Sequence, residues 1–183
     1  MKLYVMRHGE AEYNTKGLIN SNPSIDNNLT DTGVEQAKQL AEQLRGIPIE
    51  LIYTSEFPRT QQTTAIIKEV HDVPIKIHPL LSELGVDLDG GPVKEWSKQR
   101  RASADSWNFR LNNGETLAEG YRRAEKFIEH VKNENAEHIA VVTHGFVIIA
   151  LQSIVEGYSV RELYEQGDPG MIVTHEEFIT LEI

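Results

Sequence analysis

Short apolar segments alternate with helical patterns along this chain, and the alternation limits the folds that it can adopt. Each apolar segment has the length of a buried strand, and together they lie at 2–6, 51–54, 75–78 and 139–143. Apolar residues at helical spacing predict helices at 31–44, 59–70, 117–134 and 146–155. Two late strands, close enough to form an antiparallel hairpin, are expected at 171–174 and 178–183. This order predicts an α/β fold of three layers, a mainly parallel sheet with helices on both faces.

Bulk properties indicate one ordinary globular domain. At 183 residues the chain has the size of a single domain, and no repeat or linker divides it. It contains no cysteine, which excludes disulfides and is consistent with a reducing cytoplasm. The first apolar run ends at Arg7, too early for a signal peptide, and no segment is long enough to span a membrane. Because the net charge is −10, we expect no nucleic-acid or membrane partner, and the lack of cysteine and of a signal peptide leads us to expect a cytoplasmic protein.

Two arginines and two histidines stand where a parallel sheet places its ligands. Arg7 and His8 follow the first strand, His144 follows a later strand, and Arg59 lies at the start of a helix. Open parallel sheets bind ligands outside the carboxyl ends of their strands. We therefore expect both histidines to face one crevice, with the glycine after each of them allowing the backbone to pass close to a ligand.

Such a cluster is suited to phosphoryl transfer. Neutral imidazole is a good nucleophile and can form a covalent intermediate. The guanidinium groups of Arg7 and Arg59 match phosphate oxygens and stabilise the charge of the transferred group, so no metal or other cofactor is required. A leaving alkoxide needs a proton, which predicts a carboxylic acid near the site. A zinc site is the competing interpretation, but no third ligand at a suitable spacing accompanies the two histidines.

Four segments of the chain resemble, in order, those of the histidine phosphatase superfamily, also called the phosphoglycerate mutase-like family. Residues 7–14 read RHGEAEYN, 28–37 read NLTDTGVEQA, 54–64 read TSEFPRTQQTT and 141–148 read VVTHGFVI. A weaker match, NGETLAEGYRR, lies at 113–123. Because these segments cover nearly the whole chain, the resemblance implies the family's fold and a single histidine phosphatase domain over residues 1–183.

The resemblance also implies a role for each matching residue. His8 corresponds to the histidine that becomes phosphorylated. The phosphate pocket corresponds to Arg7, Arg59 and His144. Asn14 lies where the family often contacts the phosphoryl group or the substrate. Glu83 stands at the place of the acid that protonates the leaving group and then activates water.

Three departures from the family's pattern bear on these roles. The stretch after Glu83 reads ELGVDLDGG instead of E-x-x-x-G-x-x-E-G, which makes Asp87 a competitor for the role of the acid. Ala11 replaces the usual Ser or Thr, which removes one hydroxyl and no essential group. The loop over residues 14–29 is longer than usual, and its candidates for substrate selection are Asn20, Ser21 and Asn22.

Most other conspicuous side chains are expected to be structural. Surface positions are expected for Arg100, Arg101, Arg122 and Arg123. The histidines outside the motifs are His71, His78, His130, His138 and His175. Glu10 and Glu115 are expected to orient loops. Trp96 and Trp107 are expected to fill the core beneath residues 83–114, with a place in the pocket wall as the alternative for either.

The expected function is hydrolysis of a small-molecule phosphate monoester through a phosphohistidine, without a metal. A cofactor-dependent phosphoglycerate mutase is the main alternative. Mutases resemble one another in a longer insertion with several cations, of which the counterparts here are Lys98, Arg100 and Arg101. A non-catalytic phosphate-binding module is disfavoured, because none of the site residues is lost. The expected partner is a small phosphorylated substrate. Whether the protein forms a homodimer is left as an open alternative.

Overall fold

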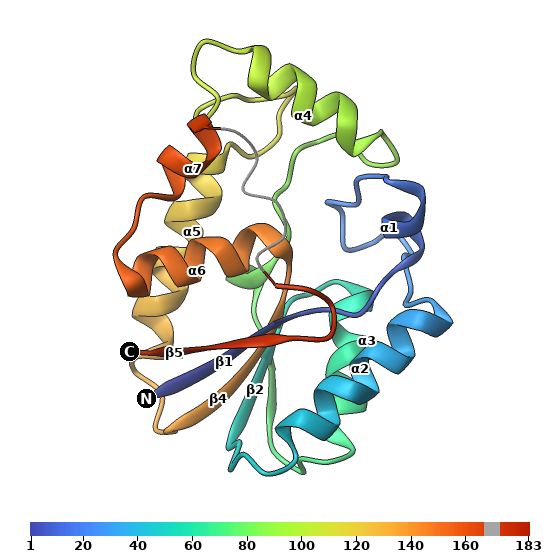
Figure 1. Ribbon diagram of the computed structural model, residues 1–183, viewed down its shortest axis with the longest axis vertical. Helices are drawn as coiled ribbons and strands as arrows, with labels where there is room; N and C mark the ends of the chain where they lie inside the picture. The colour runs from blue at the N-terminus through green and yellow to red at the C-terminus, as the bar shows by residue number, and fades with distance from the viewer. Residues whose placement is uncertain (167–172) are drawn as a thin grey trace.

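The computed structural model describes residues 1–166 and 173–183, which contain a five-stranded sheet between two layers of helices (Figure 1). The strands are β1 (Lys2–Arg7), β2 (Leu51–Thr54), β3 (Ile75–Ile77), β4 (His138–Thr143) and β5 (Phe178–Glu182). They lie in the order β3-β2-β4-β1-β5. All neighbours are parallel except β5, which pairs antiparallel with β1. The three-layer, mainly parallel α/β architecture predicted from the sequence is confirmed.

The pairing of β1 with β4 determines where the site lies. The two strands are parallel, and their register places Arg7 beside Thr143 at the carboxyl ends. The next residues, His8 and His144, therefore leave the same edge of the sheet. A hydrogen bond of 3.1 Å from the His8 amide to the Thr143 carbonyl oxygen extends this pairing past the last residue of β1.

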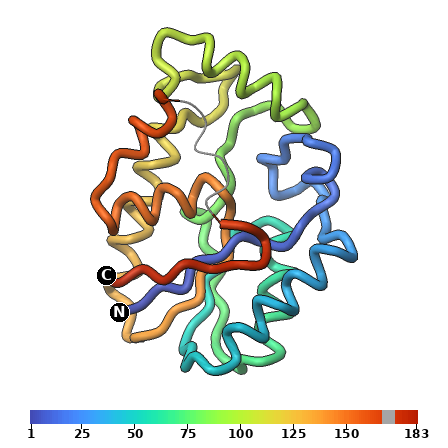
Figure 2. Tube along the Cα trace, in the orientation of Figure 1, coloured from blue at the N-terminus to red at the C-terminus, as the bar shows by residue number. Residues whose placement is uncertain are grey.

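Helices cover both faces of the sheet (Figures 1 and 2). They are α1 (Glu12–Lys16), α2 (Asp31–Leu44), α3 (Pro58–Lys68), the 3₁₀ turn η1 (Pro79–Leu81), α4 (Val93–Ala102), α5 (Leu117–Val131), α6 (Gly145–Glu156) and α7 (Val160–Gln166). Tyr4 and Met6 of β1 share a core with α2 and α3, while Leu3 and Val5 share the other core with α5 and α6. Alternate residues of one strand thus supply both cores. Within the described residues, no helix combines the length and apolar character needed to cross a membrane.

The helices begin at the residues that the sequence predicts. The Thr30 side chain accepts a hydrogen bond of 3.0 Å from the Gly33 amide and caps α2. Thr116 and Glu119 form the expected reciprocal capping box at the start of α5. Pro58 occupies the first turn of α3, where its missing N–H costs nothing.

Two expectations need correction. The stretch at 83–114, expected to be irregular, contains α4, whose sequence is so polar that its apolar residues are limited to Val93, Trp96 and Ala102. The helices α1 and α7 are too short to show a helical period. Of the strand expected at 171–174, residues 171 and 172 lie outside the described residues, and Val173 and Thr174 are not in a strand. The last strand, β5, pairs antiparallel with β1 at the edge of the sheet instead of forming a hairpin with residues 171–174.

The loop that carries His8 is packed directly on the start of α2. A Cβ at Gly9 would lie 2.2 Å from the Gly33 carbonyl oxygen, and a Cβ at Gly33 would lie 2.0 Å from the Glu10 carbonyl oxygen. Both distances are far below van der Waals contact. The glycine after His8 therefore makes room for a helix and not, as expected, for a ligand.

This close approach predicts a stability effect. Gly33→Ala is expected to lower the free energy of unfolding by about 1–3 kcal/mol, because the added methyl group must displace backbone. Gly46→Ala is the matched control, since nothing lies within 4 Å of a Cβ at that position. Urea unfolding of both variants measures the difference, and equal effects would contradict the packing described.

Candidate active site

His8 is held with one ring nitrogen directed at an arginine. The residue is 1% exposed. Its Nδ1 lies 2.7 Å from the Gly9 carbonyl oxygen, which can only accept, so Nδ1 carries the hydrogen and Nε2 has the free electron pair. Arg59 Nε donates to that Nε2 at 3.0 Å. His175 Nδ1 donates to the carbonyl oxygen of His8 at 2.5 Å, which fixes the backbone from the other side.

Arg59 connects the two histidines with the loop before α2. It lies in the first turn of α3 and is 3% exposed. Its Nη1 donates to Asn20 Oδ1, and Nη2 donates to the main-chain oxygen of Asn20 at 3.3 Å and to His144 Nδ1 at 3.2 Å. The ring of Phe57 lies 4.4 Å from the guanidinium carbon. Burial lowers the pKa of Arg59 to about 10, which leaves the side chain a cation at neutral pH.

His144 follows β4 and is fully buried. Because its Nδ1 accepts from Arg59, its hydrogen is on Nε2, which donates to Ser55 Oγ at 2.8 Å. Ser55 Oγ lies 2.8 Å from Thr60 Oγ1, whose own hydrogen goes to a main-chain carbonyl. Burial first, and then the charge of Arg59, hold the pKa of both His8 and His144 well below the usual value. Both rings are therefore neutral at pH 7.

Arg7 brings a second positive charge to the same place. Its Nε and Nη1 are buried and have no hydrogen-bond partner among the described residues. Burial lowers the pKa of Arg7, and the nearby charge of Glu83 opposes this shift. Buried donors without a partner are unfavourable, and an anion would satisfy them.

Glu83 reaches this cluster and Asp87 does not. Glu83 Oε2 lies 3.7 Å from His144 Nδ1. Asp87 is exposed, and its carboxylate accepts a hydrogen bond of 3.1 Å from the Asn113 amide. Arg123, expected at the surface, is half-buried and holds the Glu83 loop instead, because it donates to the main-chain oxygens of Leu80, Ser82 and Glu83. Sequence reasoning missed this contact because the two segments meet only in the fold.

These side chains line a cavity of about 250 Å³ at the carboxyl edge of the sheet. Its polar side consists of Arg7, His8, Asn14, Asn20, Asn27, Arg59 and Glu83. The expected catalytic residues, with Asn14 and Asn20, are thus brought together, although His144 lies behind Arg59 and not in the lining, and Ser21 and Asn22 do not line the cavity but donate their amides to Asp89. Asn14 also stabilises the start of α1, because its Oδ1 accepts from the Ala11 amide at 2.9 Å. Among the described residues, no group of three or more metal-ligating side chains is arranged around an ion site.

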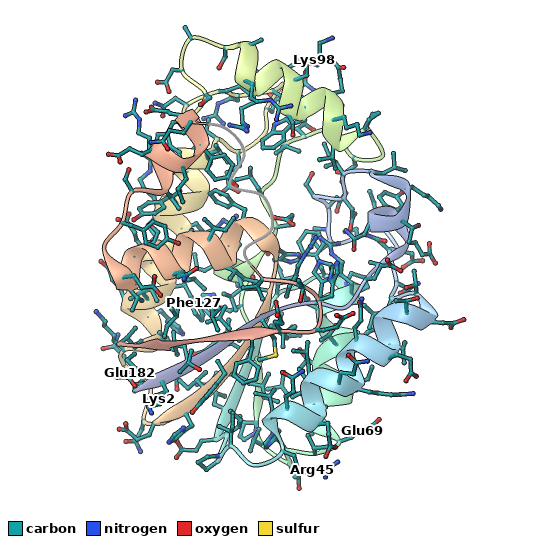
Figure 3. The ribbon with its side chains drawn as sticks, in the orientation of Figure 1. Lys2, Arg45, Glu69, Lys98, Phe127 and Glu182 are labelled. Carbon is teal, nitrogen blue, oxygen red and sulfur yellow. The ribbon has the colours of Figure 1, made fainter. Side chains whose placement is uncertain are left out.

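The cavity has an apolar side that the sequence only partly indicates. Trp96 lines it, whereas Trp107 packs against Tyr121 at a ring separation of 5.8 Å. Arg100, expected at the surface, is fully buried behind the cavity, and its guanidinium lies over the rings of Trp96 and Tyr164. Lys98 is on the outer side of α4, away from the cavity (Figure 3). Tyr164 joins the site from α7, and no sequence motif signals it.

Comparisons with known proteins agree with this geometry. The model of the histidine phosphatase superfamily (branch 1) matches residues 3–180. The adenosylcobalamin/alpha-ribazole phosphatase of Escherichia coli (strain K12) is 27% identical over 198 residues, which cover 100% of this chain and 95% of that protein. Phosphoserine phosphatase 1 of Hydrogenobacter thermophilus is 26% identical over 174 residues, covering 91% and 82%. The solved structure of Bacillus stearothermophilus YhfR matches the fold with a TM-score of 0.84 and 23% identity, covering 100% of this chain and 91% of that one.

The two buried neutral histidines make folding stability depend on pH. In the unfolded chain they take up protons below about pH 6.5. In the fold their pKa values are well below that. The unfolded state then binds more protons, so the free energy of unfolding is expected to fall from pH 7 to pH 5, by up to about 1.4 kcal/mol per pH unit for each histidine. Urea unfolding across this range measures the slope.

His144→Gln provides the control for this prediction. The variant lacks one of the two imidazoles, so its unfolding free energy should fall less steeply with decreasing pH than that of the unchanged protein. A free energy of unfolding that stays constant between about pH 7 and pH 5 in the unchanged protein would contradict burial of both rings in the neutral form.

Proposed function

We propose that this chain, which belongs to the histidine phosphatase superfamily (branch 1), hydrolyses a small phosphate monoester through a phosphohistidine on His8 Nε2. The chain is a phosphatase of this family, and the proposal concerns the residues that carry out the reaction. One observation supports it above all. The free electron pair of His8 meets a buried guanidinium at 3.0 Å, beside the unpaired donors of Arg7.

The phosphoryl group is bound by Arg7 and Arg59. The buried Nε and Nη1 of Arg7 supply donors without competing partners. Arg59 exchanges its bond to His8 Nε2 for phosphate oxygens, which frees that nitrogen at the moment when a phosphorus atom is beside it. Asn20 and His144 keep the Arg59 guanidinium in place during this exchange, since each contacts one of its terminal nitrogens. Two guanidiniums stabilise the spread negative charge of the transition state.

Proton transfer falls to Glu83. In the first step, the His8 Nε2–phosphorus bond forms while the bond from phosphorus to the ester oxygen breaks, and the Glu83 carboxylic acid gives that oxygen its proton. In the second step, water attacks phosphorus and gives a proton to the Glu83 carboxylate, while the phosphorus–nitrogen bond breaks and inorganic phosphate leaves. Glu83 ends in its starting form. It lies at the cavity, 3.7 Å from His144, whereas Asp87 does not line it.

The mutase alternative lacks support in the cavity. A mutase must hold the second charged group of a bisphosphate, and the expected cations were Lys98, Arg100 and Arg101. None of the three lines the cavity. The cavity's described lining contains two lysine or arginine residues, Arg7 and Arg59. Both bind the transferred phosphoryl group, so neither remains for a second phosphate. The small phosphate esters named for the relatives support hydrolysis of a monoester.

Removing the nucleophile tests the first step. His8→Ala is expected to lower kcat for p-nitrophenyl phosphate by at least about 1,000-fold, measured in EDTA to exclude a metal-dependent rate. His138→Gln is the control, because His138 lies at the opposite end of β4. A loss of activity in EDTA by the unchanged protein, or a substantial rate in His8→Ala, would contradict the mechanism.

A pair of carboxyl variants tests the acid. Glu83→Gln is expected to slow an alkyl phosphate by about 100-fold and p-nitrophenyl phosphate by less than about tenfold, because a good leaving group needs little protonation. Asp87→Asn should leave both rates unchanged. If Asp87→Asn shows this dependence on the leaving group instead, the acid is Asp87.

A further inference from the structure

We propose that the apolar side of the cavity binds the alcohol part of the substrate, and that this part is a planar apolar ring without a second anionic group. The inference rests on the proposed function, because it concerns the leaving group of the same reaction. It assigns a substrate class to the site: phosphate monoesters of uncharged aromatic or aryl-alkyl alcohols.

The composition of the wall is the first argument. The apolar residues of the lining include Leu18, Ile19, Val93, Trp96, Phe146 and Tyr164. The aromatic rings of Trp96, Phe146 and Tyr164 come from three different helices, α4, α6 and α7. Aromatic rings favour stacking or edge contacts with another ring, in addition to the burial of apolar area. Such a surface offers little to a short polar alcohol.

One apolar side chain of the wall is left open to water. Val93 is 41% exposed, and it is one of three exposed large apolar side chains among the described residues. It lies three residues before Trp96, so both occupy the same face of α4. A ring bound against Trp96 would cover Val93 as well. The remaining two, Ile75 and Ile77, belong to the edge strand β3 and not to the cavity.

The wall is already formed in the free protein. The Ile19 amide donates to the Gly91 carbonyl oxygen and the Val93 amide to that of Gly17, both at 2.9 Å, so the loop after α1 is joined to the start of α4. Behind the wall, the Arg100 guanidinium carbon lies 5.4 Å from the Trp96 ring and 4.9 Å from the Tyr164 ring. These contacts hold both rings in place, which lowers the entropy lost when a ligand binds.

Charge is the second, independent argument. Among the described lining residues, the arginines and lysines are Arg7 and Arg59, and both are required by the phosphoryl group. The other charged residue of the lining that takes part in the reaction, Glu83, is an acid and cannot bind a carboxylate as a cation would. A carboxylate on the alcohol would lose water on the apolar side without gaining a cation, which is strongly unfavourable. Esters such as O-phosphoserine or phosphoglycerate are therefore poor substrates for this cavity.

Two matched esters test the substrate class. Benzyl phosphate and 4-carboxybenzyl phosphate share a ring and a benzylic alcohol, so the acid is needed equally by both and only the added carboxylate differs. We expect kcat/KM to be at least about tenfold higher for benzyl phosphate, and higher for it than for O-phosphoserine. Equal values for the matched pair, or a preference for O-phosphoserine, would overturn the inference.

Variants of the wall locate the effect. Trp96→Ala is expected to lower kcat/KM for benzyl phosphate about tenfold, mainly through KM, while Trp96→Phe keeps most of it. Trp107→Ala is the control, a tryptophan of the same region that does not line the cavity. Because Val93 is exposed, the variant Val93→Arg leaves the core unchanged. It should lower the ratio of kcat/KM for benzyl phosphate to kcat/KM for 4-carboxybenzyl phosphate. An unchanged kcat/KM for benzyl phosphate in Trp96→Ala, or an unchanged ratio of the two esters in Val93→Arg, would refute the assignment.

The failure of this inference can be told from the failure of the proposed function. If p-nitrophenyl phosphate is hydrolysed through His8 but the two benzyl esters react equally, the leaving-group site alone is wrong. If His8→Ala retains its activity, the proposed function fails, and the inference falls with it.

Discussion

The parallel pairing of β1 with β4 is the constraint on which the site depends. Because Arg7 lies beside Thr143 in that register, the histidines that follow the two strands leave the sheet together. A shift of one residue would turn Arg7 from the cavity into a core, since neighbouring residues of a strand point to opposite faces. The hydrophobic alternation of β1, which supplies both cores, therefore also fixes the place of the catalytic cluster.

Placing two guanidiniums near each other inside a protein is costly, and the surroundings of Arg7 and Arg59 reduce this cost unequally. Arg59 has partners at each nitrogen, among them Asn20 and His144. Arg7 keeps two buried donors unpaired. The acidic excess of the chain, 28 Asp and Glu against 18 Lys and Arg, reaches the two arginines through Glu83, which acts on both, and through Asp89, which acts on Arg59. The cavity is thus prepared for an anion inside a protein whose net charge repels anions.

The two sides of the cavity come from different parts of the fold. The polar side is built at strand ends and at the first turn of α3, where packing restricts movement. Apart from Phe146 of the core helix α6, the aromatic part of the apolar side comes from α4 and α7, and the loop after α1 adds Leu18 and Ile19; these are short or polar elements outside the sheet. The residues that carry out the reaction therefore lie on the rigid framework, and the residues that select the leaving group lie on segments outside it. Arg100 joins these segments from beneath, by contact with the rings of Trp96 and Tyr164.

The amino-acid sequence alone determined the order of the five strands and of the helices α2, α3, α5 and α6, the caps at Thr30 and Thr116, and the cluster of Arg7, His8, Arg59 and His144, because these depend on local periodicity and on motifs. It left Glu83 and Asp87 as alternatives for one role, and it predicted surface positions for Arg100 and Arg123. Only the tertiary structure places Glu83 at the cavity, Arg123 beneath its loop and Arg100 behind the aromatic wall. These placements depend on contacts between segments far apart in the chain, and a polar helix such as α4 carries no periodic signal of what it covers.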